Sequence, residues 1–283
     1  MTDLGSSSDR SQDALNRTFA VLNRDIPFHP IQHLSDNLKR AQESRTLAST
    51  SLNLDSNVAI GLDTNALFRL GMNGSSGADA VDYLASIHKA PLIIPGQVAQ
   101  EVWNNALSAV QPNAKSLKSA IDKLIFEAEK LDRDLGPRSE GAIDASSQFA
   151  QWHGDWIDES NQKALVGTLE NLSSRAISKS VSRTRFSALA QIRNDTKTPP
   201  GFSDHNSNHG DFYVWADFLY GLAESNLEGV QGVLFVTEDQ KPDWSRAGVA
   251  HPTLSAEIEA LTGLPFSLCS LKGFYRLVKD ASK

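Results

Sequence analysis

Four acidic side chains stand where predicted strands end or predicted helices begin. Asp63 directly follows the apolar run VAIGL, and Asp239 comes shortly after the run VLFV. Glu101 and Asp211 each lie early in a predicted helix. In parallel α/β sheets, ligands bind outside the carboxyl ends of the strands. We therefore expect the four carboxylates to face one cleft at that edge of a sheet.

Such a cluster of carboxylates indicates a site for hard divalent cations. Like charges repel one another, so their convergence is costly unless a counter-charge is present. Mg²⁺ and Mn²⁺ prefer oxygen ligands, activate water and neutralise the charge that grows on a phosphodiester during hydrolysis. Each acid taken alone has a simpler explanation, as a helix cap or as a partner of the helix dipole. Only their joint placement favours metal-dependent phosphodiester hydrolysis.

The segments that must position these acids alternate between strands and helices. Strands are predicted where short apolar runs are bounded by turn residues, and helices where apolar residues recur at helical spacing. The predicted strands are 58–62, 91–94, 233–236 and 266–269, and the helices predicted between them are 97–109, 211–223 and 254–261. This alternation predicts an α/β fold with a mostly parallel sheet of four or five strands.

The rest of the chain is expected to form an N-terminal extension and a helical insertion. Residues 1–57 are the extension, partly helical, in which the polar segment 1–25 is expected to fray and a helix is predicted over 34–48. Residues 58–283 are the main domain, with a large helical insertion at about 111–199. No strand is expected in the insertion, and its predicted helices are 114–135, 149–157 and 164–189.

Composition excludes several classes of protein. Hydrophobic residues make up 40% of the 283 residues, enough to fill a core, and Cys269 has no second cysteine with which to form a disulfide. No apolar run of roughly 18 residues exists, and the first residues lack the apolar stretch of a signal peptide. A cytoplasmic protein without a membrane partner is therefore expected. The sequence also lacks the GxxxxGK[ST] run of P-loop NTPases and the GxSxG run of serine hydrolases.

A basic stretch interrupts a chain whose net charge is −7. Residues 163–197 carry seven basic side chains against two acidic ones, a local charge of +5. The candidate nucleic-acid-binding side chains in it are Arg175, Lys179, Arg183 and Arg185. The first three follow i, i+4, i+8 spacing, so we expect one helix face to present them to phosphates, with Phe186 available to stack on a base. A solvated helix face without a partner explains the same charges.

Four runs around the acidic residues resemble the signature blocks of the PIN domain, and they occur in the order found in that family. The runs are IGLDTNALF (60–68), IIPGQVAQEVW (93–103), GDFYVWADFL (210–219) and LFVTEDQKPDW (234–244). The VTxDxKxDW pattern in the last run and the long insert resemble a bacterial PIN-like group. The resemblance implies a three-layer α/β/α fold and a metal-dependent nuclease, in most members a ribonuclease.

The resemblance also implies roles for individual residues. The four acids correspond to the family's catalytic metal ligands, which bind Mg²⁺ or Mn²⁺. The supporting polar residues that match the family pattern are Thr64, Asn65, Thr237 and Lys241, the last as a phosphate contact. Trp244 in the same run is expected to be buried. The implied substrate is single-stranded or structured RNA, or DNA, which is cut to a 5′-phosphate and a 3′-hydroxyl.

Three questions stay open at the level of sequence. The loop before Asp211 holds His205 and His209, which suit either a zinc site or a loop without a ligand. A PIN-like fold can also serve as a catalytically inactive module that binds a protein or a nucleic acid. The resemblance does not distinguish a toxin with an antitoxin or other regulatory protein from a defence effector or a processing enzyme.

Overall fold

The structure, a computed structural model, describes residues 4–44, 54, 57–72, 74–106, 112–135, 141, 144, 159–203, 209–239 and 241–281. It forms two compact units, one of Met1–Val102 with Gly167–Lys283 and one of Trp103–Val166. The second unit contains α6 (Pro112–Leu135), close to the helix predicted over 114–135. All four acidic residues belong to the first unit. None of the described helices combines the length and the apolar character that crossing a membrane requires.

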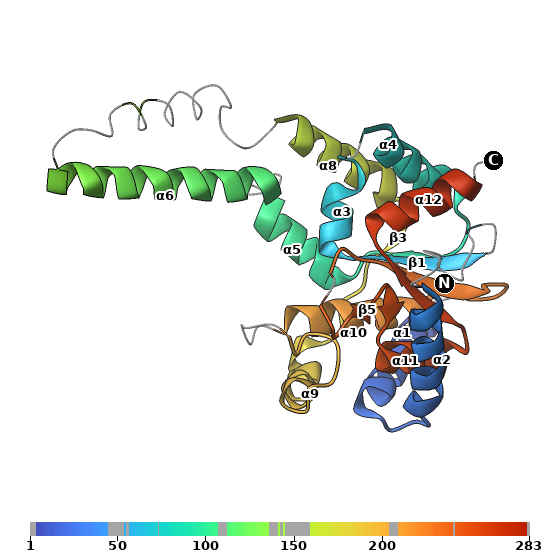
Figure 1. Ribbon diagram of the computed structural model, residues 1–283. Coiled ribbons are helices and arrows are strands. Elements are labelled where there is room, and N and C mark those ends of the chain that lie inside the picture. Colours follow the sequence, from blue (N-terminus) through green and yellow to red (C-terminus); the bar gives the residue numbers. More distant parts are fainter. Residues whose placement is uncertain are drawn as a thin grey trace. The chain divides into compact units, whose positions relative to one another are not determined.

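A five-stranded sheet forms the centre of the first unit (Figure 1). Its order is β3-β2-β1-β4-β7, and every neighbouring pair is parallel. Its strands are β1 (Val58–Leu62), β2 (Leu92–Ile93), β3 (Ala176–Ile177), β4 (Gly232–Val236) and β7 (Phe266–Cys269). All residues of β1 and β4 are buried, which explains why these strands are continuous apolar runs. The predicted parallel sheet is confirmed. A separate antiparallel hairpin is formed by β5 (Ser245–Arg246) and β6 (Val249–Ala250).

Helices cover both faces of this sheet and complete three layers (Figure 1). One layer holds α3 (Thr64–Leu70), α4 (Gly74–Asp82) and α12 (Leu271–Ala281), which contact one another. The other layer holds α1 (Leu4–Asn23), α10 (Gly210–Glu224) and α11 (Pro252–Thr262), with α2 (Pro30–Ser44) against α11 and α9 (Arg183–Asp195) against α1. The three-layer α/β/α fold is thereby confirmed.

Residues Leu4–Asn23 form the helix α1, so the expectation that the segment 1–25 frays is wrong for the part of it that the structure describes. In α1 a stripe of Ala14, Thr18, Val21 and Leu22 is buried at i, i+4, i+7, i+8 spacing, and the helix contacts α10. The stripe is narrow and contains a threonine, whose hydroxyl is satisfied by the Ala14 carbonyl at 2.8 Å. Because most residues of α1 are polar, the sequence pattern did not indicate this helix. The helix predicted over 34–48 is α2, and its predicted last residues lie outside the described ones.

The expected helical insertion contains a strand, contrary to prediction. β3 is two residues long and pairs only at the edge of the sheet, so its pattern is too short to recognise. It separates α8 (Glu159–Ser173) from α9, and a single helix over 164–189 is therefore wrong. Ser182 starts α9 because its hydroxyl accepts a hydrogen bond from the Arg185 N–H at 3.3 Å. The helix predicted over 149–157 lies outside the described residues.

The connections of the sheet run in opposite directions from its two central strands. The chain leads from β1 to β2 on one side and from β4 to β7 on the other. The carboxyl ends of β1 and β4 therefore meet at the switch point, where parallel sheets bind their ligands. Gly61 in β1 allows close approach of α10, because a Cβ at this position would lie 2.3 Å from the Phe218 ring. Gly61 therefore lets α10, whose first turn carries Asp211, pack directly on β1.

A buried ion pair joins the helices of the layer that contains α10. Arg193 of α9 is only 3% exposed, and its Nη1 donates to Glu257 Oε1 of α11 at 2.7 Å. Trp215 of α10 donates its indole N–H to Glu257 Oε2 at 2.7 Å. One buried carboxylate therefore holds three helices together.

Replacing Glu257 by alanine is expected to lower the free energy of unfolding by about 3–5 kcal/mol, because it leaves the Arg193 guanidinium buried without its counter-charge. The double variant Arg193→Met/Glu257→Leu removes both charges and should recover the part of that loss due to the unpaired charge, while the Trp215 indole N–H still lacks its acceptor. Urea denaturation of the wild type, Glu257→Ala, Arg193→Met and the double variant measures the free energy of unfolding of each. A loss below about 1 kcal/mol in Glu257→Ala would contradict this assignment.

Candidate active site

Asp63 is held between the ends of the two central strands. Its Oδ1 accepts a hydrogen bond from the Thr64 backbone N–H at 2.7 Å, which caps α3. Its Oδ2 accepts one from the Thr237 hydroxyl, just beyond β4, at 2.8 Å. The residue is buried, with 8% of its surface exposed. Asp63 is thus a helix cap and also a link to the neighbouring strand.

Glu101 in α5 (Gly96–Ala106) joins this group through Thr64. The Thr64 hydroxyl donates to Glu101 Oε2 at 2.6 Å. Gln97, one turn earlier in the same helix, donates its side-chain amide to Glu101 Oε1 at 3.0 Å. Both oxygens of Glu101 are therefore fixed by donors, and Thr64 connects this carboxylate to Asp63.

Lys241 binds the other two acids. Its Nζ lies 2.9 Å from Asp211 Oδ2 and 2.8 Å from Asp239 Oδ2. Asp239 is held in turn by the Lys241 backbone N–H, which donates to its Oδ1 at 2.8 Å. The backbone N–H of Asp239 donates to the Thr237 hydroxyl at 2.9 Å. The lysine ammonium therefore serves as the counter-charge of both carboxylates.

One chain of hydrogen bonds and ion pairs joins all four carboxylates. Its members, in order, are Glu101, Thr64, Asp63, Thr237, Asp239, Lys241 and Asp211. We call these seven residues the acidic network. Burial raises the pKa of Asp63 to about 7, the charges of Asp211 and Glu101 add to the rise, and hydrogen bonds from Thr237 and Thr64 oppose it. The pKa of Asp63 therefore depends in part on the charges of acidic residues that lie far from it in the sequence.

The donor set suits a hard divalent cation. The candidate ligand atoms are carboxylate oxygens, which Mg²⁺ and Mn²⁺ prefer. The Lys241 ammonium stands in for such an ion, between Asp211 and Asp239. Across the described residues, no three acidic, histidine or cysteine side chains are arranged to hold an ion in this conformation. At Asp211 and Asp239 the ammonium group would therefore compete with a metal ion for the same carboxylate oxygens.

Two residues donate hydrogen bonds to the acidic side chains although the sequence did not predict this role for them. Trp244 is 1% exposed, as expected of a structural aromatic, and its ring stacks on Phe235 with centroids 5.5 Å apart. Its indole N–H also donates to Asp211 Oδ2 at 3.2 Å. The other donor is Gln97, whose position four residues before Glu101 was the only signal in the sequence.

Three other residues that the sequence analysis singled out are not part of the acidic network. Asn65 is exposed on the first turn of α3. His205 lies outside the described residues. His209 immediately precedes α10 in a left-handed conformation, with φ 53°, and its side chain does not cap the helix. No zinc site is assigned from these residues.

The basic residues do not share a helix face, contrary to prediction, because the chain turns into β3 between them. Each is bound within the chain: Arg175 to the His88 carbonyl, Lys179 to Glu224 at 2.6 Å, Arg183 to Asp217 at 2.9 Å and Arg185 to Asn16 at 2.9 Å. Phe186 is fully buried and packs edge-on against Phe19. The expected stacking of a base on Phe186 is therefore wrong.

Arg183 supports the acidic network from within the fold. Its guanidinium forms two hydrogen bonds of 2.9 Å with the buried Asp217 and a third of 3.1 Å with Gln97 Oε1. Asp217 also accepts the Gln97 backbone N–H at 2.8 Å. Gln97 is thus fixed at both its backbone and its side chain. We infer that Arg183 positions Glu101 through Gln97.

Replacing Asp63 by asparagine is expected to stabilise the metal-free protein, and increasingly so as the pH rises. Folding raises the pKa of Asp63 from 3.8 to about 7, so ionisation between these values costs the folded wild type stability that the variant keeps. The difference should reach at most about 4 kcal/mol. The Thr237 hydroxyl can accept as well as donate, so it can pair with the new amide. Thermal unfolding in EDTA across this pH range measures the gain, and a gain independent of pH would contradict the burial of Asp63.

Replacing Lys241 by methionine is expected to destabilise the metal-free protein and to tighten Mn²⁺ binding. Two part-exposed ion pairs stabilise by roughly 1–2 kcal/mol together, so the dissociation constant for Mn²⁺ should fall by about tenfold once no ammonium must be displaced. Isothermal titration calorimetry measures the constant, with Lys272→Met on the exposed surface of α12 as the matched control. Equal or weaker Mn²⁺ binding by Lys241→Met would show that the ammonium does not occupy the cation position.

Comparison with known families agrees with this geometry. A family model described as a PIN like domain matches residues 59–255, which include the whole acidic network. Comparisons with curated proteins and with solved structures give no significant match. The matched span covers well over half of the 283 residues and contains β4 and all of β1 except Val58. The resemblance seen in the sequence is confirmed, and the chain belongs to the PIN-like domain family.

Proposed function

We propose that this chain is a metal-dependent nuclease that hydrolyses phosphodiester bonds in RNA. The observation that carries the proposal is the acidic network, which joins four carboxylates at the switch point of a PIN-like sheet. Like charges that converge in this way favour a bound cation. The proposal places the enzyme in the cytoplasm, where RNA is available.

The four carboxylates of the network would hold Mg²⁺ or Mn²⁺. When bound, the ion supplies activation of water and neutralises charge on the phosphodiester. The protein's contribution is to fix the carboxylates beforehand. Thr237 and Thr64 hold Asp63, and Thr64 with Gln97 holds Glu101. Groups that are fixed in this way need little reorganisation during the reaction.

Glu101 is the group best placed to orient the attacking water and to take its proton, because it is only partly buried and both its oxygens are anchored. Attack of water on phosphorus breaks the bond to the 3′ oxygen, which takes up a proton. The products are a 5′-phosphate and a 3′-hydroxyl. Once released from Asp211 and Asp239, the Lys241 ammonium can bind a phosphate oxygen.

A second function, nucleic-acid or protein binding without catalysis, is favoured by one observation. Lys241 already neutralises Asp211 and Asp239, so the network is stable without a metal ion. A thermal shift experiment separates the two functions, since a ligand stabilises only the state that binds it. Stabilisation of the wild type by Mn²⁺, absent in Asp63→Asn, supports the nuclease. No shift in either protein supports the binding module.

Asp239→Asn is expected to lower the rate of RNA cleavage by on the order of 100-fold or more while leaving the fold intact, because it removes a charged group of the site. Labelled single-stranded RNA and DNA are incubated with each protein in Mn²⁺ or in EDTA, and the products are resolved on gels. Asp79→Asn, on the exposed surface of α4, is the matched control and should cut like the wild type. Equal cleavage by Asp239→Asn, or cleavage that persists in EDTA, would refute the proposal.

A further inference from the structure

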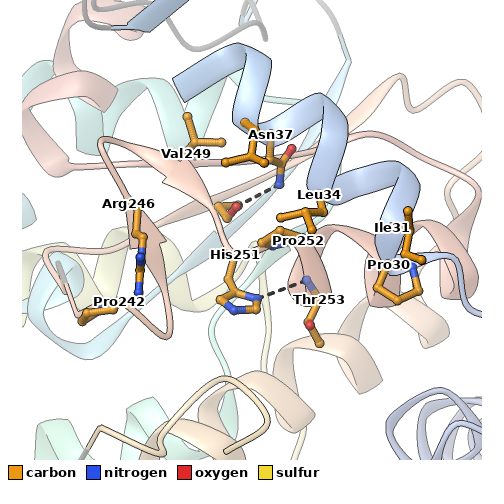
Figure 2. A pocket seen from close by; sticks show the side chains of 12 residues that line it. Pro30, Ile31, Leu34, Asn37, Pro242, Arg246, Val249, His251, Pro252 and Thr253 are labelled. Carbon is orange, nitrogen blue, oxygen red and sulfur yellow. Dashed lines mark hydrogen bonds between the residues drawn. The ribbon is translucent and has the colours of Figure 1, made fainter. Parts of the chain in front are cut away.

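An apolar groove lies between α2 and the β5–β6 hairpin, with a volume of about 370 Å³ (Figure 2). Its α2 wall includes Ile31 and Leu34, which are 80% and 46% exposed. Asn37 fixes this wall to the hairpin, because its side-chain amide donates to the Ala250 carbonyl at 2.9 Å. The groove is therefore formed by the packing of α2 on the hairpin, and apolar side chains in its wall are exposed to solvent.

The groove adjoins a second hollow that reaches the acidic network. The second hollow has a volume of about 490 Å³, and Thr237 and Asp239 belong to its lining. Pro242 and Arg246 line both hollows. A strand of nucleic acid bound at Asp239 can therefore continue past Arg246 into the groove.

Arg246 is an exposed cation at the junction of the two hollows. Its guanidinium makes no hydrogen bond or ion pair with another residue that the structure describes. In this it differs from Lys179 and Arg183, whose charges are used inside the chain. An arginine in this position is free to bind a phosphate with both arms of its guanidinium.

His251 is one of the polar side chains that line the groove (Figure 2). Its Nδ1 accepts a hydrogen bond from the Thr253 backbone N–H at 3.2 Å. Burial, and then the charge of Arg246, lower the pKa of His251, so the ring is neutral at neutral pH. The hydrogen of the neutral ring is therefore on Nε2, where it can donate to a carbonyl oxygen or ring nitrogen of a base.

We propose that the groove binds one nucleobase of the substrate strand and that Arg246 binds the phosphate between this nucleotide and the cleavage site. The proposal rests on the proposed nuclease function and extends it, because it assigns a binding position beyond the acidic network. Leu34, Val249 and Pro252 offer apolar surface to the face of the base. The charge at the junction and the continuity with Asp239 favour a nucleic-acid strand over a protein segment.

The test measures binding separately from cleavage. A fluorescein-labelled single-stranded RNA of about twelve nucleotides is titrated in EDTA and followed by anisotropy at several salt concentrations. Arg246→Gln should weaken binding about tenfold and reduce the salt slope by about 0.7, the share of one phosphate contact. Leu34→Gln should weaken binding about fivefold and leave the salt slope unchanged. The matched controls are Arg276→Gln on α12 and Ile87→Gln, both exposed and outside the groove, and both should bind like the wild type.

A series of RNAs with one abasic nucleotide tests the base contact. Wild-type binding should weaken at a single position, and that sensitivity should vanish in Leu34→Gln. Variants that bind like their controls, or equal loss at every abasic position, overturn the proposal. A change of oligomeric state in Leu34→Gln without a change in RNA affinity also overturns it, because the groove then binds protein. If the wild type does not cleave RNA in Mn²⁺ but the binding results are as expected, the proposed nuclease function is refuted and the proposed binding site is not.

Discussion

Four carboxylates can share one edge of a sheet only if hydrogen-bond donors and a counter-charge hold them there. In this chain two threonine hydroxyls and one lysine ammonium fill these roles. Thr237 is central, because its hydroxyl donates to Asp63 and accepts from the Asp239 backbone. Repulsion is thereby reduced in the metal-free protein, and under the proposed function the remaining repulsion would favour exchange of the ammonium for a divalent cation.

The supporting fold is arranged to deliver side chains to this edge. The switch point brings the ends of β1 and β4 together, and Gly61 lets α10 approach closely. Arg183 and Asp217 hold Gln97 in place through hydrogen bonds. Two charged residues outside the acidic network thereby help to position Glu101, to which Gln97 donates. Lys179 and Arg183 are thus bound within the fold, whereas the Arg246 guanidinium beside the site pairs with none of the residues that the structure describes.

The sequence was most informative where pattern and chemistry coincide. Buried apolar strands and the acids that follow them could be read directly, because a parallel sheet needs continuous apolar runs and ends them abruptly. The strand β3 could not be read, since two residues carry no usable pattern. The partners of Arg183 and Lys241 could not be read either, because hydrogen bonds between distant segments follow from the tertiary fold. For the same reason the spacing of the basic residues suggested a helix face that does not exist.

The most direct test of the central claim is a crystal structure of the protein soaked in Mn²⁺, with anomalous scattering used to locate the ion. We expect an anomalous peak within ligand distance of carboxylate oxygens from the acidic network, with the Lys241 ammonium moved away from Asp211 and Asp239. A Lys241 that keeps both ion pairs, with no peak among the four carboxylates at saturating Mn²⁺, would contradict it.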